Sequence, residues 1–71
     1  METISQLLRV DRKEINYLRV TLESYDGMAL VRTVDARAAV IEVRIARGCV
    51  SLIFELLKDL KDREGMDIET G

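Results

Sequence analysis

The sequence predicts an α+β fold in which two helices cover one face of an antiparallel sheet. Three short segments have the pattern of a strand, either through two faces of different polarity or through a high content of Val, Leu and Thr. Two longer segments repeat apolar residues at helical spacing, and a glycine follows each of them. The order is strand, helix, strand, strand, helix, with room for a short final strand. This split βαβ order is typical of a ferredoxin-like plait, βαββα(β).

The first strand is expected from Ile4 to Val10, with one face more apolar than the other. Asp11 stands where a helix N-cap is expected, and Glu14 follows at capping-box spacing. The first helix is expected over Arg12 to Tyr25. Asp26 and Gly27 end it, because glycine adopts the left-handed conformation that many helix C-termini need. The apolar stripe of this helix consists of Ile15, Leu18, Leu22 and Tyr25.

Two further strands are expected, from Met28 to Asp35 and from Ala39 to Ala46. The second of these has the clearest alternation in the chain, with Ile41, Val43 and Ile45 on one side. Strands joined by so short a connection are expected to pair as an antiparallel hairpin.

The second helix is expected from about Cys49 to Arg63, after a break at Arg47 and Gly48. Leu52 and Phe54 widen its apolar arc beyond what one sheet face requires. Gly65 closes the helix, and residues 66–69 are a candidate fourth strand. The core stripe of this helix consists of Val50, Ile53, Leu56, Leu57 and Leu60.

Seventy-one residues predict a single domain, residues 1–71. A core of this size rarely contributes more than about 3–5 kcal/mol without a disulfide, a metal or a partner subunit. Cys49 is the only cysteine and the chain has no histidine, which excludes an internal disulfide and argues against structural zinc. Self-association, most simply as a homodimer, is therefore the expected additional source of stability.

The net charge of −2 gives little electrostatic reason to expect a nucleic-acid partner. No apolar run approaches the roughly 20 residues that span a bilayer, so no membrane partner is expected. The N-terminus lacks the pattern of a signal peptide, and a lone thiol suits a reducing compartment. A cytoplasmic location is therefore expected.

The sheet face that no helix covers is the most informative predicted surface. If Ile41, Val43 and Ile45 point toward the helices, their neighbours point away, next to Leu7 of the first strand. A register slip of one residue would invert the second strand's contribution. Such a face is either an interface or anion-binding surface, or a solvated face on which Glu42 pairs with a neighbouring arginine. The candidate interface or anion-binding residues are Arg9, Leu30, Arg32, Val34, Val40, Glu42 and Arg44.

Other chemistries have weaker signals. Cys49 near a helix N-terminus has no histidine to act as its base, so a small, partly buried hydrophobe is the favoured interpretation. Arg47 and Gly48 do not form a phosphate-binding loop. The middle strands carry none of the aromatic residues with which RNA-binding plaits stack bases. No catalytic, cofactor-binding or metal residues are assigned, and the protein is not expected to be an enzyme.

The segments Val10 to Leu18, Tyr25 to Ala29 and Arg32 to Asp35 resemble an uncharacterised family of small bacterial proteins. The resemblance covers roughly residues 7–62 and implies no site residues, because the family is a domain of unknown function. In outline the chain also looks like an ACT-type regulatory domain, a resemblance that implies dimerisation and binding of small metabolites. ACT-type ligand sites commonly use a glycine in the turn after the first strand, and the turn at Val10 to Arg12 has none.

Two hypotheses follow. The first is a non-enzymatic interaction or regulatory module that self-associates through the open sheet face or a strand edge. The alternative is an ACT-like sensor in which Arg32 and Arg44 hold a small anionic metabolite.

Overall fold

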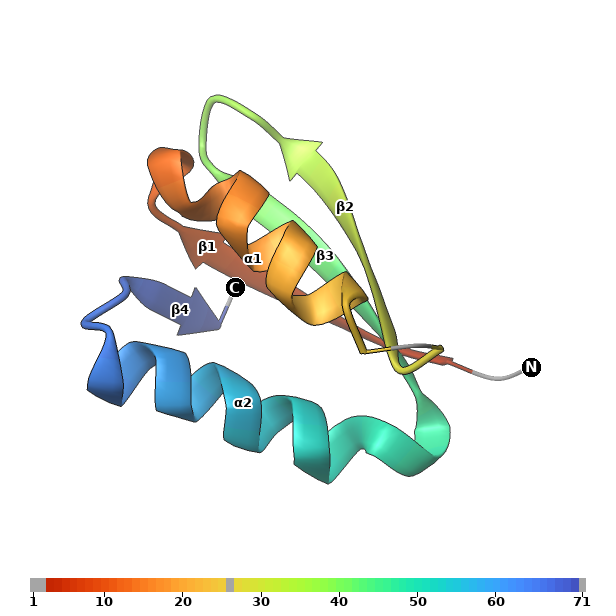
Figure 1. The fold of residues 1–71 in the computed structure, drawn as a ribbon. Helices are drawn as coiled ribbons and strands as arrows, with labels where there is room; N and C mark the ends of the chain where they lie inside the picture. Colours follow the sequence, from red (N-terminus) through yellow and green to blue (C-terminus); the bar gives the residue numbers. More distant parts are fainter. Residues whose placement is uncertain (1–2, 26, 71) are drawn as a thin grey trace.

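The computed structural model describes residues 3–25 and 27–70, and within them the chain forms a four-stranded antiparallel sheet with both helices on one face (Figure 1). The spatial strand order is β2-β3-β1-β4. This arrangement confirms the predicted ferredoxin-like class. The strands are β1 (Thr3–Val10), β2 (Ala29–Asp35), β3 (Val40–Ala46) and β4 (Ile68–Thr70).

Each α-helix begins with a short 3-10 turn. Helix α1 (Ile15–Glu23) follows η1 (Arg12–Glu14), and helix α2 (Val50–Arg63) follows η2 (Arg47–Cys49).

The chain enters the first helical segment through the predicted N-cap. The Asp11 carboxylate accepts a hydrogen bond from the Lys13 backbone N–H at 3.2 Å. This bond goes to Lys13 and not to the Glu14 N–H, and Glu14 makes no side-chain cap hydrogen bond of its own, so the N-cap forms without the capping box. The helix was expected to reach Tyr25 but ends at Glu23, and Tyr25 is 39% exposed instead of buried. Asp26 lies outside the described residues, and Gly27 has the left-handed φ of 71° that was expected of it.

The β2–β3 hairpin confirms the predicted pairing but corrects one boundary. Ala39 was expected to open the third strand, yet it has a φ of 56° and lies in the turn. The Asp35 carboxylate builds this turn by accepting hydrogen bonds from the N–H groups of Arg37 at 2.9 Å and Ala38 at 3.1 Å. Such Asx turns explain why aspartate is common at this position.

Helix α2 ends as predicted, at a glycine with φ of 66°, Gly65. Met66 then folds back into the core, and its N–H donates to the Leu60 carbonyl at 3.4 Å. The predicted fourth strand forms, although it begins two residues later than expected, at Ile68.

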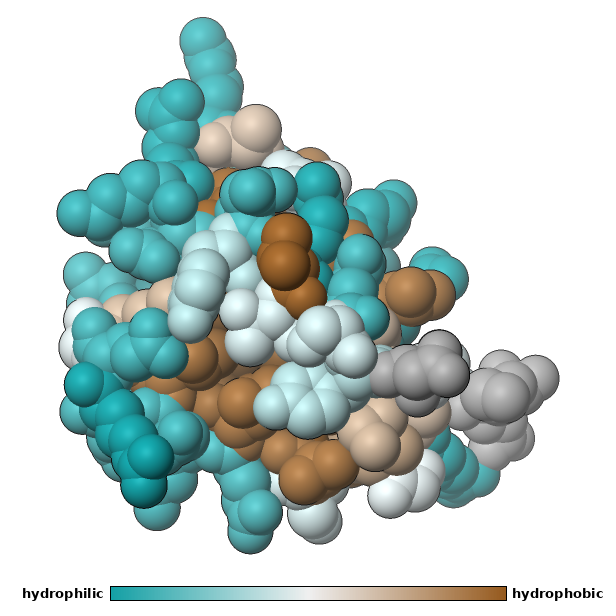
Figure 2. All heavy atoms as spheres, in the orientation of Figure 1, coloured by the Kyte–Doolittle hydropathy of each residue, from teal (hydrophilic) through white to brown (hydrophobic). Residues whose placement is uncertain are grey.

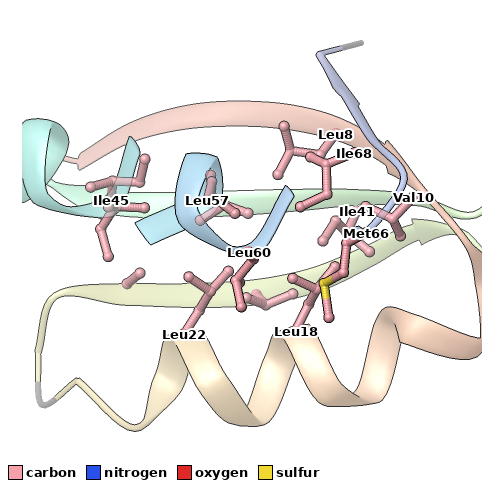
Figure 3. Close-up of a cluster of buried hydrophobic side chains, with 14 residues drawn as sticks. Leu8, Val10, Leu18, Leu22, Ile41, Ile45, Leu57, Leu60, Met66 and Ile68 are labelled. Atoms are coloured by element: carbon pink, nitrogen blue, oxygen red, sulfur yellow. The ribbon is translucent and has the colours of Figure 1, made fainter. Parts of the chain in front are cut away.

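The core lies between the sheet and the two helices (Figure 3). Leu18 and Leu22 of α1 and Ile53 of α2 are fully buried against Ile41 and Ile45 of β3. Val50 and Leu56, also predicted in the α2 stripe, are only half-buried, whereas Leu57 and Leu60 are buried. No helix in the described part of the chain combines the length and hydrophobicity that crossing a membrane requires.

Candidate interaction surface

The sheet face opposite the helices is formed by alternate residues of β1, β2 and β3. In β3, Ile41, Val43 and Ile45 are fully buried against the helices, and the residues between them point to the other side. Leu30 of β2 lies opposite Arg44, and Arg32 lies opposite Glu42. The predicted register of the second strand is therefore confirmed at Leu30 and Arg32, which share the open face with Glu42 and Arg44. The register shifts between Thr33 and Asp35, so Val34 has no partner in the ladder.

A small charge cluster occupies the middle of this face. The Glu42 Oε1 atom lies 3.2 Å from Arg32 Nε and 3.4 Å from Arg44 Nε. The Glu42 side chain is only 13% exposed, because the two longer arginine side chains flank it. The pKa of Glu42 is lowered, mainly by a hydrogen bond from Ser5; desolvation opposes this effect, and the charges of Arg44 and Arg32 lower the pKa further. The pairing of Glu42 with neighbouring arginines, one of the two alternatives left open by the sequence, is thus present.

Apolar side chains surround the charge cluster. Leu30 is 65% exposed, Val34 is 48% exposed and Leu7 is 41% exposed, while Val40 is half-buried. Leu7 lies directly opposite Glu42 in the β1–β3 ladder. At the far side of the face, Arg9 pairs with Glu69 of β4 at 4.0 Å. The open face is therefore apolar around a nearly balanced set of charges.

One sheet edge is closed by side chains that the sequence pattern did not reveal. The Glu23 carboxylate of α1 accepts a hydrogen bond from the Val31 N–H of edge strand β2 at 2.9 Å. Arg19 of α1 donates to the Thr33 hydroxyl at 3.0 Å. These contacts join residues 8 and 14 positions apart, and only the docking of α1 brings them together. The first contact occupies a backbone N–H that another strand would otherwise pair with.

The helix side carries two grooves that were not predicted. One, of about 310 Å³, is lined by Tyr25, Leu52 and Leu56 with the acidic residues Glu55 and Asp59. Apolar surface is visible in this region, over and beside α2, in Figure 2. The other, of about 500 Å³, lies where α2 meets β4. The wide apolar arc noted on the second helix was the only sequence signal for either groove.

The remaining candidate positions lie apart from these surfaces. Cys49 is half-buried against the core at the start of α2, next to Gly48. Among residues 3–25 and 27–70, no three His, Cys, Asp or Glu side chains gather in a way that could hold a metal ion.

Fold and surface together define a small α+β domain of the ferredoxin-like class, with an uncovered sheet face. The chain belongs to the family described as "Domain of unknown function (DUF4911)", whose model matches residues 8–63, most of its length. No curated protein and no solved structure shows significant similarity to it.

Proposed function

We propose that this protein is a non-enzymatic interaction module that self-associates through its open sheet face. The observation that carries the proposal is the exposure of Leu30, Val34 and Leu7 on one face. Large apolar side chains exposed together on one face typically mark a contact with another molecule. Sheets also pack face to face readily, with side chains interdigitating between them.

The charges of the face are compatible with burial. Glu42 is already held between two arginines, so covering it leaves no unpaired carboxylate. The cluster of Arg32, Arg44 and Glu42 has one excess positive charge, which carboxylates at the rim of a second copy can balance. A two-fold axis would place the same surface of both copies in contact, as in most homodimers.

The face is a better candidate than the β2 edge. Pairing of two β2 strands would require the Val31 N–H to exchange its bond with Glu23 for a bond across the interface. It would also disturb the contact between Arg19 and Thr33. The open face has no such contacts to break.

A reducing compartment such as the cytoplasm is part of this proposal. The chain has one cysteine, half-buried Cys49, and no second thiol with which it could form an internal disulfide.

A substitution that introduces a charged side chain on the open face tests the proposal. Leu30→Glu places a carboxylate on the most exposed apolar position of that face and is expected to weaken self-association by about tenfold or more, about 1.4 kcal/mol. Val20→Glu is the matched control, because Val20 is 60% exposed on α1, on the opposite side of the sheet. Sedimentation equilibrium measures both. Equal association of Leu30→Glu and the unmodified chain contradicts the proposal.

The alternative is an ACT-like sensor of a small anionic metabolite. A hollow of about 320 Å³ lined by Arg32, Arg44 and Leu30 supports it. Two features favour self-association over this alternative. Both guanidinium groups already share Glu42, and Glu23 adds a second carboxylate to the hollow.

The usual position of an ACT-type ligand offers less support. The hollow next to the β1–α1 turn is lined by Asp11, Asp67 and Glu69, which repel an anion, and by Arg9.

The melting temperature of the protein, measured with a panel of nucleotides, amino acids and carboxylates, distinguishes the sensor from the self-associating module. A ligand-dependent rise in melting temperature that Arg32→Ala abolishes favours the sensor. No rise with any member of the panel counts against it.

A further inference from the structure

The hollow of about 320 Å³ beside strand β2 is built from well-separated parts of the chain. Strand β2 forms one edge of the sheet, next to β3 (Figure 1). The lining comes from helix α1 and from these two strands, all of them far from both ends of the sequence. The packing of α1 against the sheet therefore shapes the hollow. It is lined by Glu23, Leu30, Val31, Arg32 and Arg44.

The polar groups of the hollow already have partners. Glu23 accepts a hydrogen bond from the Val31 N–H at 2.9 Å. Arg32 Nε and Arg44 Nε lie 3.2 and 3.4 Å from the same Glu42 oxygen. Two guanidinium charges thus face two carboxylates, and the charges in and around the hollow balance.

This balance favours an uncharged occupant over an ion. An apolar side chain that enters the hollow takes no hydrogen-bond partner away from the groups that line it, so it leaves no polar group unsatisfied. The aliphatic stems and planar guanidinium groups of arginine also pack well against apolar groups. The hollow is therefore suited to a side chain such as leucine.

A side chain of this kind projects from the rim of the same hollow. Leu30 is 65% exposed and lies opposite Arg44 in the β2–β3 ladder. A two-fold axis brings the same surface of both copies together, so a contact made by one copy is made again by the other. A protruding residue next to a hollow that suits it is therefore complementary to its own copy.

We propose that Leu30 of each copy fills the hollow of the other copy in the self-associated form. This inference rests on the proposed function and identifies the residue at the centre of that contact. Because Leu30 also lines the hollow, the two Leu30 side chains touch each other, and the two-fold axis passes close to β2. A side chain that is desolvated in a pocket near the centre of an interface contributes most to its affinity.

The other exposed apolar residues of the open face suit this role less well. Leu7 is 41% exposed and Val34 is 48% exposed, and neither lines the hollow. A contact centred on either residue would leave the hollow empty beneath the interface, and its walls would lose packing contacts.

Opposite charges at position 30 test whether the two copies of this residue meet. Leu30→Glu and Leu30→Lys are each expected to weaken self-association, because each homodimer brings two like charges together. Arg32 and Arg44 do not offset the repulsion between the glutamates, since both already share Glu42. An equal mixture of the two variants is expected to associate about tenfold more tightly than either variant alone. Sedimentation equilibrium measures all three samples at about 0.15 M salt, where charges more than about 8 Å apart are largely screened.

Val34→Glu and Val34→Lys form the matched control on the same strand. Their mixture is expected to gain much less over the separate variants, because Val34 lies away from the axis. Weakened association of both Leu30 variants without recovery in the mixture overturns this inference and leaves the open-face contact standing. Unchanged association of both Leu30 variants contradicts the proposed function as well.

Nuclear Overhauser effects between two copies of the unmodified chain provide a test that requires no substitution. A sample mixed from ¹³C-labelled and unlabelled chains reports only contacts between different copies. Contacts from the Leu30 methyl groups to the side chains of Arg32 and Arg44 are expected. Intermolecular contacts confined to Leu7 or Val34 would place the axis elsewhere and overturn the inference.

Discussion

The two faces of the sheet differ sharply although the same strands form them. On the covered face, Ile41, Val43 and Ile45 of β3 have no exposed surface. On the open face, the intervening Glu42 and Arg44 belong to a charge cluster bordered by exposed aliphatic residues. The comparison indicates that the covered face stabilises the monomer, which leaves the open face free to carry a contact with a partner.

The largest expected difference concerns two neighbours on α2. Ile53→Ala is expected to destabilise the fold by about 2–5 kcal/mol, because Ile53 is fully buried and its truncation leaves a cavity. Leu52→Ala is the control, and it is expected to cost less than about 1 kcal/mol since Leu52 is 45% exposed. Urea unfolding of both variants measures the costs. Equal costs would mean that the inner face of α2 is wrongly assigned.

A second test makes the same substitution, valine to alanine, on each of the two faces of β3. Val43→Ala is expected to cost about 2 kcal/mol, because it removes two fully buried methyl groups. Val40→Ala removes the same groups from the open face and is expected to cost less than about half as much in dilute solution. Repeating the urea titration at high protein concentration sharpens the comparison. The cost of Val40→Ala is expected to rise there if the open face is buried in a dimer.

The smallest expected effect is a pH dependence on the open face. The pKa of Glu42 in the folded protein lies below its ordinary value of 4.5, so the folded state favours the ionised carboxylate. The stability from Glu42 is therefore fully present above the unfolded pKa and is lost as pH falls through the folded pKa. Glu42→Gln is expected to be less stable than the unmodified chain at pH 7, and the difference is expected to shrink in the acid range. An unchanged difference down to pH 3 would mean that neither Ser5 nor the arginines stabilise this carboxylate.

Much of the covered face could be predicted from the sequence. The alternation of Ile41, Val43 and Ile45 fixes which side of β3 is buried, and the helical spacing of Leu18 and Leu22 gives the inner side of α1. The open-face residues follow from the same alternation. Periodicity is informative here because a single hydrophobic layer decides the orientation of every element.

The sequence predictions that were wrong concern residues at which a helix or strand ends or begins. Tyr25 continues the helical spacing of α1, but the helix has already ended at Glu23. Ala39 continues the alternation of β3, but the Asx turn at Asp35 places it in the left-handed region. Local turn geometry overrides periodicity at both positions.

The edges of the sheet could not be predicted, because they depend on contacts between distant elements. The bond from Val31 to Glu23 exists only once α1 lies over β2. The pairing of β4 with Leu8, Arg9 and Val10 of β1 likewise depends on the fold and not on the residue pattern of either segment.

The central claim is that the open face is occupied by a second copy of the chain. Absolute mass from light scattering, followed over a wide dilution series, tests it most directly. The account predicts a mass twice that of the 8.1 kDa chain at high concentration, which falls toward the monomer on dilution and does so earlier for Leu30→Glu. A mass of one chain at every concentration would contradict it.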